Sequence, residues 1–309
     1  MREIRSILVC GAGMMGKNIA FVMTAAPEYS VALYDLYEVD VAAGIRANTA
    51  QLVEKGVMTA EEVESRLSRI EFTTDLESSL ISGADLVVEA VYEDMAIKQE
   101  TFARLEARCA ADAIFCTNSS VMSPSRISEK LEHRERFAGT HFWNPGHLIP
   151  LVEVIRSDAT SDETAETVMS VLRKVGKRPV LCKKDVPGFI ANRMQHALWR
   201  EAISIVERGI ADAATVDEAV RYSFGLRLPQ LGPMENADMV GTDLTYSIHD
   251  YILRDLEDSH EPSPMLKRLK EEGKLGFKTG EGFQKWTPEQ AAQSNAGLNE
   301  YLIRMLYGK

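Results

Sequence analysis

The stretch SILVCGAGMMGKNIA, residues 6–20, decides the fold. Its first five residues are mostly apolar, which is typical of a buried parallel strand. The strand ends at Gly11, and the residues that follow Gly13 and Gly16 predict a helix. Three glycines at this spacing are weak evidence alone. A strand before them and a helix after them together predict a dinucleotide-binding unit.

The glycines and the next acidic residue suit different parts of a dinucleotide. Gly11 permits the tight turn, Gly13 lets backbone N–H groups approach a pyrophosphate, and Gly16 lets the helix pack closely on the strand. The N-terminus of the helix then faces the phosphate charge. Asp35 closes the next strand, where a carboxylate accepts from ribose hydroxyls and repels a 2′-phosphate. The pattern favours NAD over NADP. FAD uses the same turn and stays a rival on these residues alone.

The rest of the first half alternates between strand and helix patterns. Strand patterns cover residues 30–35, 70–76, 84–91, 113–120 (strand, then polar turn), 137–142 and 150–155. Helical patterns cover residues 14–26, 38–69 in two pieces, 95–109 and 161–176, with Thr59 as an N-cap and Gly176 as a stop. This alternation predicts the α/β class, with a Rossmann-type doubly wound sheet.

The pattern changes after DVPGFIANR, residues 185–193. Long helical stretches follow at 189–208, 215–223 and 235–256, and no strand pattern returns. We therefore expect two domains, an NAD-binding Rossmann-type domain over residues 1–186 and an all-helical C-terminal domain over residues 187–309.

Composition narrows the class of protein. The chain has 309 residues and a formal net charge of −11, which argues against a nucleic-acid or anionic-membrane partner, because such partners need a basic face. Its four cysteines are scattered without a CxxC pair, as expected for free thiols in a reducing compartment. No apolar run approaches the ~20 residues of a membrane helix. No HxH, HExxH or Cys/His cluster indicates a metal site. We expect a soluble cytoplasmic protein without a metal.

One segment places an acid where an apolar residue is usual. In RFAGTHFWNPGHLIPLVEVI, residues 136–155, His141 lies near the end of one strand and Glu153 lies inside the apolar run LVEVI of the next. Oxidation of an alcohol needs a base for the hydroxyl proton, and imidazole titrates near neutrality. A carboxylate on the second ring nitrogen would fix the tautomer. The alternative is a surface histidine beside a solvated glutamate.

Several motifs, in order and at matching spacing, resemble the L-3-hydroxyacyl-CoA dehydrogenase family. They are TNSSVMSPSRISEKLEHRERFAGTHFWNP, LVEVI and DVPGFIANR, and the likeness runs from residue 11 to residue 283. The resemblance implies NAD rather than FAD, and a helical second domain that binds substrate and forms a homodimer.

The resemblance also implies roles for single residues. It makes His141 the catalytic base and Glu153 its orienting carboxylate, with Ser120 bonded to the substrate oxygen and Asn192 near the substrate carbonyl. It further implies three cofactor contacts, which are Glu93, Lys98 and Asn144.

Two departures from the family concern the substrate. Members that use CoA carry a basic helix for its nucleotide end, but here only Lys55 remains of the lysine cluster and Asn48 stands where a serine is frequent. An extended loop also carries Arg227, which could clamp a substrate carboxylate or simply pair with a nearby acid.

Three functions stay open at this point. The family default is a 3-hydroxyacyl-CoA substrate. The near alternative is a small free carboxylate such as carnitine, gulonate or 5-formyl-3-hydroxy-2-methylpyridine 4-carboxylate. The third is a non-catalytic NAD-binding structural or sensor protein, which the joint presence of His141, Glu153, Ser120 and Asn192 disfavours.

Overall fold

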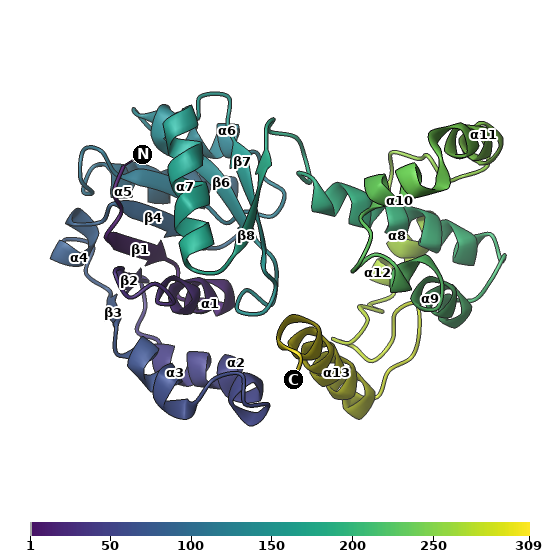
Figure 1. The fold of residues 1–309 in the computed structure, drawn as a ribbon, viewed down its shortest axis with the longest axis horizontal. Coiled ribbons are helices and arrows are strands. Elements are labelled where there is room, and N and C mark those ends of the chain that lie inside the picture. The colour runs from purple at the N-terminus through teal and green to yellow at the C-terminus, as the bar shows by residue number, and fades with distance from the viewer. Residues whose placement is uncertain (1) are drawn as a thin grey trace. The chain divides into compact units, whose positions relative to one another are not determined.

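The computed structural model describes residues 2–309. The chain forms two compact units, one of residues up to 191 together with 297–309, and one of residues 192–296. The first unit contains the sheet and the second is helical. Figure 1 shows the strands and helices of both units.

The first unit is built on a single eight-stranded sheet with the order β3-β2-β1-β4-β5-β6-β7-β8. All neighbouring strands are parallel except β6 and β7, which are antiparallel. The strands are β1 Ser6–Cys10, β2 Ser30–Tyr34, β3 Ile70–Thr73, β4 Leu86–Glu89, β5 Ile114–Thr117, β6 Phe137–Phe142, β7 Leu151–Arg156 and β8 Arg178–Cys182. The order reverses between β1 and β4, and a doubly wound sheet binds its ligand at that position.

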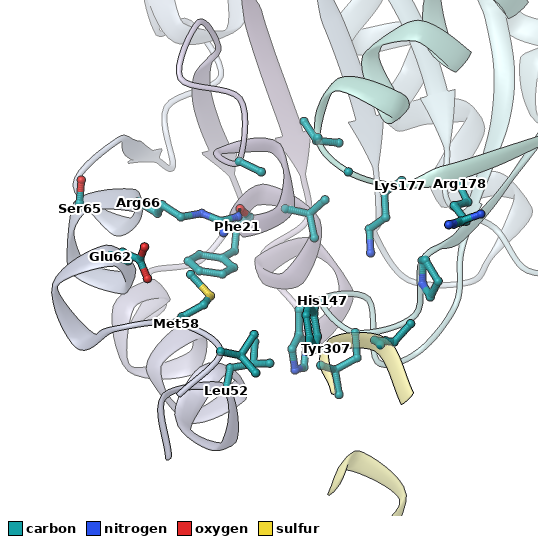
Figure 2. Close-up of a pocket in the computed structure, with 18 of the residues that line it drawn as sticks. Phe21, Leu52, Met58, Glu62, Ser65, Arg66, His147, Lys177, Arg178 and Tyr307 are labelled. Atoms are coloured by element: carbon teal, nitrogen blue, oxygen red, sulfur yellow. Dashed lines mark hydrogen bonds between the residues drawn. The ribbon is translucent and has the colours of Figure 1, made fainter. Parts of the chain in front are cut away.

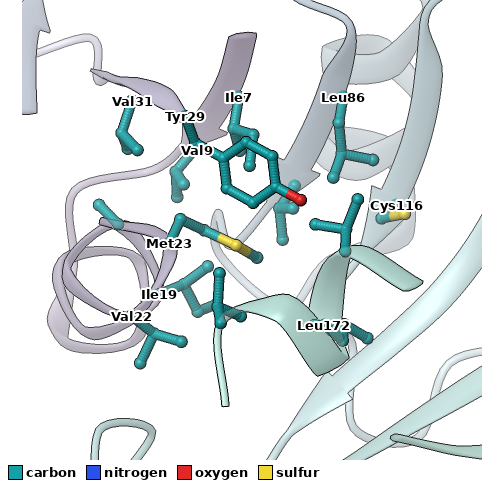
Figure 3. Close-up of a cluster of buried hydrophobic side chains, with 14 of the residues drawn as sticks. Ile7, Val9, Ile19, Val22, Met23, Tyr29, Val31, Leu86, Cys116 and Leu172 are labelled. Atoms are coloured by element: carbon teal, nitrogen blue, oxygen red, sulfur yellow. The ribbon is translucent and has the colours of Figure 1, made fainter. Parts of the chain in front are cut away.

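Helices cover both faces of this sheet. They are α1 Met14–Met23, α2 Val41–Glu54, α3 Ala60–Leu67, α4 Ser79–Ser82, α5 Met95–Glu106, α6 Pro124–Ile127 and α7 Asp162–Lys174, with short 3₁₀ turns at Ser128–Lys130 and Arg134–Arg136. Side chains of α1 and α7 pack with the strands in one apolar cluster, part of which is shown in Figure 3. Side chains of α5 form a second cluster with residues of β1, β4 and β5, including Phe102 and Phe115. The largely apolar strands β1, β4 and β5 are therefore covered on both faces.

The expected α/β class and its Rossmann-type sheet are confirmed. Thr59 caps α3 in a complete capping box, and Gly176 follows α7 with a positive φ of 80°. One strand was not predicted. β8 reads RPVLC, and Pro179 lacks the N–H that a central strand would use. As the last strand of the sheet, β8 tolerates this proline.

The second unit contains only helices as regular elements. They are α8 Ala191–Glu207, α9 Ala213–Arg221, a 3₁₀ turn at Phe224–Leu226, α10 Pro233–Val240, α11 Thr242–Ile252 and α12 Pro264–Glu271. The expected helix over 235–256 is divided at Gly241, whose φ of 100° no helix interior allows. Helix α12 was not predicted.

The last helix, α13 Pro288–Tyr307, was also missing from the sequence-based expectations. It starts among residues of the second unit, and from residue 297 onward it belongs to the first. The division into domains at residues 186 and 187 stays a prediction. Within residues 2–309, no helix has both the length and the apolar composition needed to cross a membrane.

Candidate active site

The sheet places His141 and Glu153 directly opposite each other. They are cross-strand partners in the antiparallel pair of β6 and β7. His141 Nδ1 lies 2.9 Å from Glu153 Oε2. His141 is 4% exposed and Glu153 is fully buried, so this is not a surface histidine beside a solvated acid.

Glu153 is held by four hydrogen-bond donors. Besides His141, Trp143 Nε1 donates to Oε2 at 3.2 Å, and the backbone N–H groups of Ile190 and Ala191 both donate to Oε1 at 2.9 Å. Burial raises the pKa of Glu153, but the hydrogen bonds from His141, Ala191 and Ile190 outweigh it, so the pKa lies below its ordinary value. The carboxylate is therefore ionised and fixed.

A local turn supplies two of those donors. Gly188 and Phe189 both have positive φ, 76° and 52°, which is uncommon for a bulky side chain such as Phe189. The next two N–H groups, those of Ile190 and Ala191, point at Glu153. The Phe189 ring is buried, and its centroid lies 5.8 Å from that of His141. The turn thus helps both to hold the acid and to enclose the imidazole.

This arrangement selects one tautomer of His141. Trp143 and the two backbone N–H groups can only donate, so the carboxylate of Glu153 acts as acceptor throughout. His141 Nδ1 then carries its proton toward Glu153, and Nε2 of the neutral ring is left with a lone pair. A lone pair on a fixed imidazole is what a general base requires.

The glycine turn has the geometry of a phosphate cradle. Gly11 has a φ of 103°, and a Cβ there would lie 2.6 Å from the carbonyl oxygen of Ala90. A Cβ on Gly16 would lie 1.7 Å from the carbonyl oxygen of Gly11. A Cβ on Gly13 would meet nothing within 4 Å, so the space above this residue is open. Gly13 is also the N-cap of α1 and provides no side chain to cap the helix. The N–H groups there suit an anion.

Asp35 lies one residue beyond β2 and is tied to the same turn. Its Oδ2 accepts from the backbone N–H of Ala12 at 2.6 Å, and its Oδ1 accepts from that of Tyr37 at 3.2 Å. The carboxylate is therefore fixed beside the glycine turn at the end of β2. In a doubly wound sheet, this is where an acid meets the adenosine ribose.

A buried ionic network lies across the ends of β4 and β5. Lys98 Nζ donates to Glu89 Oε1 at 2.7 Å and lies 3.1 Å from Glu93 Oε2. The Glu89 carboxylate also accepts from Thr117 Oγ1 and from the backbone N–H of Val91, each at 2.7 Å. Burial raises the pKa of Glu89, and Lys98, Thr117 and Val91 oppose that rise. Lys98 is 1% exposed, so the charged group of this network that solvent reaches is the Glu93 carboxylate.

The remaining predicted site residues lie in turns or in the second unit. Ser120 is exposed in the turn after β5. Asn118, in the same turn, accepts from the Phe142 N–H at 2.9 Å and so ties this turn to the end of β6. Asn144 is exposed, three residues after His141. Asn192 is buried in the first turn of α8, in the second unit.

The two residues singled out for substrate binding have different surroundings. Lys55 Nζ donates to Glu300 Oε1 of α13 at 2.7 Å. Asn48, one of the positions of the expected CoA helix, donates to Asn18 Oδ1 at 2.7 Å. Arg227 is exposed in the second unit, just after the 3₁₀ turn.

A separate pocket of about 860 Å³ lies in the first unit beside α1, α2 and α3. Figure 2 shows Lys177 and Arg178 on one side of it, Phe21 and Arg66 on the other, and His147 with Tyr307 between them. His141 and Glu153 do not line it. Among the described residues, the Nδ1 atom of His147 is buried without a hydrogen-bond partner.

Comparison with known proteins agrees with this geometry. The family model "3-hydroxyacyl-CoA dehydrogenase, NAD binding domain" matches residues 6–186, and "3-hydroxyacyl-CoA dehydrogenase, C-terminal domain" matches residues 188–286. The chain belongs to the 3-hydroxyacyl-CoA dehydrogenase family. It is therefore an NAD-dependent oxidoreductase that acts on CH–OH groups.

Two relatives in the 3-hydroxyacyl-CoA dehydrogenase family differ in how much of the chain they match. The 5-formyl-3-hydroxy-2-methylpyridine 4-carboxylate 5-dehydrogenase of Mesorhizobium japonicum is 33% identical over 99% of this chain and 99% of its own. The human mitochondrial hydroxyacyl-coenzyme A dehydrogenase is 39% identical over 92% of this chain and 91% of its own.

Solved structures show the same difference. A crystal structure of 5-formyl-3-hydroxy-2-methylpyridine 4-carboxylic acid 5-dehydrogenase, an NAD⁺-dependent dismutase, matches with a TM-score of 0.86 at 32% identity, over 99% of this chain and all of that one. The 3-hydroxybutyryl-CoA dehydrogenase of Escherichia coli matches with a TM-score of 0.77 at 32% identity, over 92% of this chain and 60% of that one.

The structure fits the NAD that the family uses. The open space above Gly13, the uncapped N-terminus of α1 and the fixed Asp35 carboxylate provide a phosphate cradle and a ribose acceptor on neighbouring strands. The carboxylate of Asp35 and the glycine turn are held to each other by the Ala12 hydrogen bond, so both are ready before a ligand binds.

Three residues of the site were missed by reasoning from sequence. Glu89 stands in the apolar run ADLVVEAV, the same signal that drew attention to Glu153, and it could have been found that way. Trp143 and Phe189 gave no signal of their own, because an aromatic residue in an apolar segment usually indicates core packing.

Proposed function

We propose that this enzyme oxidises a hydroxyl-bearing carbon with His141 as the general base. His141 Nε2 takes the hydroxyl proton, while the Nδ1–H group keeps its hydrogen bond to the Glu153 carboxylate. The negative charge of Glu153 then stabilises the imidazolium that forms. Bound NAD supplies the hydride acceptor. The observation that carries the proposal is the buried 2.9 Å contact between the two side chains, with Glu153 fixed by three further donors.

We assign the other residues by their matches to the family. Ser120 and Asn192 hold the reacting oxygen and its neighbourhood. Gly11, Gly13, Gly16 and Asp35 hold the adenosine and pyrophosphate half of NAD, and Asn144 contacts the nicotinamide half. Phe142 supports this, because its N–H ties the turn that carries Ser120 to the strand that carries His141. The catalytic pair also disfavours a purely structural or sensor role.

We further propose that the substrate is a small free carboxylate rather than a CoA thioester. The family model ends at residue 286, before α13. Glu300 of α13 pairs with Lys55, and Ile303 is buried against Leu52 of α2 and Leu148. This helix therefore covers α2 where a CoA nucleotide would need its lysine. The enzyme that matches the chain over 99% of its length acts, by its name, on a pyridine carboxylate.

Arg227 is our proposed partner for the substrate carboxylate. It is exposed, and no acid is bonded to its side chain among the described residues. A guanidinium without an ion pair can bind a carboxylate through two parallel hydrogen bonds. Arg221, also exposed in the same unit, pairs with Asp217 at 4.0 Å and offers a matched control.

A substrate panel tests this choice. NADH formation or consumption is followed with acetoacetyl-CoA, 3-hydroxybutyryl-CoA, carnitine, gulonate and 5-formyl-3-hydroxy-2-methylpyridine 4-carboxylate. We expect the highest kcat/KM with one of the free carboxylates. Arg227→Ala should then raise the KM for that carboxylate about tenfold or more, because a bidentate ion pair is lost. Arg221→Ala should leave this KM unchanged. A preference for the CoA thioesters would overturn the assignment.

We also propose that the active form is a homodimer joined through the second unit. Within residues 192–296, the described buried residues are Asn192 and Ser204, and none is hydrophobic. Large apolar side chains there are exposed instead, for example Tyr222, Met234 and Tyr251. A helical unit without a buried core needs a partner surface to cover these side chains. Sedimentation equilibrium should give twice the chain mass of 34.4 kDa, and a monomer would contradict this.

The location in the cell is a proposal of the same kind. The structure has four free cysteines, Cys10, Cys109, Cys116 and Cys182. Free thiols and a pool of NAD both fit the cytoplasm. With a net charge of −11, we propose no nucleic-acid or membrane partner.

A further inference from the structure

We propose that Glu93 makes the site selective for the oxidation state of the cofactor. In this proposal Glu93 is an ionised carboxylate aimed at the nicotinamide half of NAD, and Lys98, Glu89 and Ser119 are positioning residues. The inference rests on NAD binding and is independent of the substrate.

The Glu93 carboxylate is held at both oxygens. Lys98 Nζ lies 3.1 Å from Oε2, and the Ser119 hydroxyl donates to Oε1. Ser119 is buried and also accepts from the Met122 N–H at 3.0 Å, so its hydroxyl has one orientation. The side chain of Glu93 remains 40% exposed. A carboxylate with two fixed anchors and an exposed edge is ready to face a ligand.

The charge of the network is carried by Glu93. The three neighbours of the Glu89 carboxylate, which are Lys98, Thr117 and the Val91 N–H, all donate to it. The Lys98 ammonium and the Val91 N–H can only donate, and both donate to Glu89 Oε1 at 2.7 Å, which favours the charged form of the carboxylate. Glu89 is therefore an ionised acceptor that balances the Lys98 ammonium. The three charged groups are Lys98, Glu89 and Glu93, so one negative charge is not balanced. It lies on Glu93, the one of the three whose side chain reaches the surface.

The position of Glu93 in the fold indicates which half of the cofactor it meets. Glu93 is in the loop after β4, and this loop packs on the glycine turn, since a Cβ on Gly11 would lie 2.9 Å from the Val91 nitrogen. Asp35 lies on the opposite side of that turn, after β2. A dinucleotide crosses such a sheet at the switch between β1 and β4. If the adenosine lies on the side of Asp35, the nicotinamide lies on the side of Glu93.

The charge has a specific consequence there. The nicotinamide ring is a cation in NAD⁺ and neutral in NADH. A fixed carboxylate nearby, partly shielded from water, stabilises the cation and has little effect on the neutral ring. Glu93 therefore favours binding of NAD⁺ over NADH, and Lys98, at 1% exposure, acts only through Glu93.

The test compares the dissociation constants of the two cofactor forms. Glu93→Gln keeps the shape of the side chain and removes its charge. Titrations followed by protein or NADH fluorescence should show the ratio Kd(NAD⁺)/Kd(NADH) rising on the order of three- to tenfold. The rise should shrink at high salt, because the site is partly exposed. An unchanged ratio in Glu93→Gln overturns the proposal.

Two further variants separate charge from packing. Ser119→Ala removes an anchor without changing the charge, so it should weaken both cofactor forms by a similar factor and keep the ratio. Glu89→Gln leaves Lys98 to neutralise Glu93, so it should raise the ratio although Glu89 is fully buried and cannot touch a ligand. A uniform loss of affinity in a folded Glu89→Gln protein would contradict the charge balance. If that variant does not fold, Glu93→Gln alone decides.

Discussion

Lys55, the C-cap residue of α2, and Glu300 of α13 form an ion pair with 2.7 Å between Nζ and Oε1. The pair gives a direct test of the substrate class. If the substrate is a free carboxylate, Lys55→Met should leave the KM for that substrate within about twofold. Lys55 would then not contact the substrate, and exposed ion pairs contribute little to the stability of the fold. If a CoA nucleotide binds there, the same change should raise KM for acetoacetyl-CoA severalfold or more. Glu300→Gln is the matched control, since it frees Lys55 and should improve CoA binding only in the second case.

Replacing His141 should abolish turnover without loss of the cofactor. A general base contributes about 10²–10⁴-fold to the rate, so we expect His141→Ala to lower kcat by at least 10²-fold. The glycine turn and Asp35 do not depend on His141, and NAD should bind with nearly the wild-type Kd. His133, exposed and paired with Glu135, is the control histidine. Turnover near the wild-type rate in His141→Ala would end the proposed mechanism.

The parts of this enzyme that could be predicted from sequence are those with local signals. The glycine turn, Asp35 and the alternating strands follow from spacing and periodicity. Glu153 could be singled out because an acid inside an apolar strand needs a partner. The two backbone donors from Ile190 and Ala191 could not be predicted, since their direction depends on positive φ angles at Gly188 and Phe189.

Strand β8 and helix α13 escaped prediction for a related reason. β8 contains a proline and charged neighbours, and it forms because β7 pairs with it at the edge of the sheet. The role of α13 depends on contacts distant in sequence, such as that between Ile303 and Leu52. Tertiary contacts of this kind leave no periodic signal in the segment itself.

Glu153→Gln should impair catalysis by reversing the tautomer of His141. One end of the amide still accepts from the N–H groups of Ile190 and Ala191. The other end is then an NH₂ group that faces both His141 Nδ1 and the Trp143 N–H. Trp143 cannot accept, so the response falls to His141, whose Nδ1 becomes the acceptor while Nε2 carries the proton. We expect kcat to fall about 10²–10⁴-fold and the pH dependence of kcat/KM to change. A folded variant with the wild-type pH profile would exclude the orienting role.

His147 should make the stability of the fold depend on pH between about 6.5 and about 4. Burial, and then the charge of Lys177, lower the pKa of His147 from 6.5 to about 4. The folded state therefore keeps the imidazole neutral, whereas the unfolded chain takes up a proton below about 6.5. The stability that neutral His147 provides is complete above that pH and is lost as the pH falls toward 4. His147→Asn cannot titrate, so its Tm should decline less than that of the wild type between pH 7 and 4.5. His133→Asn, at an exposed site, is the control and should follow the wild type. Equal slopes in all three proteins would show that folding does not lower the pKa of His147.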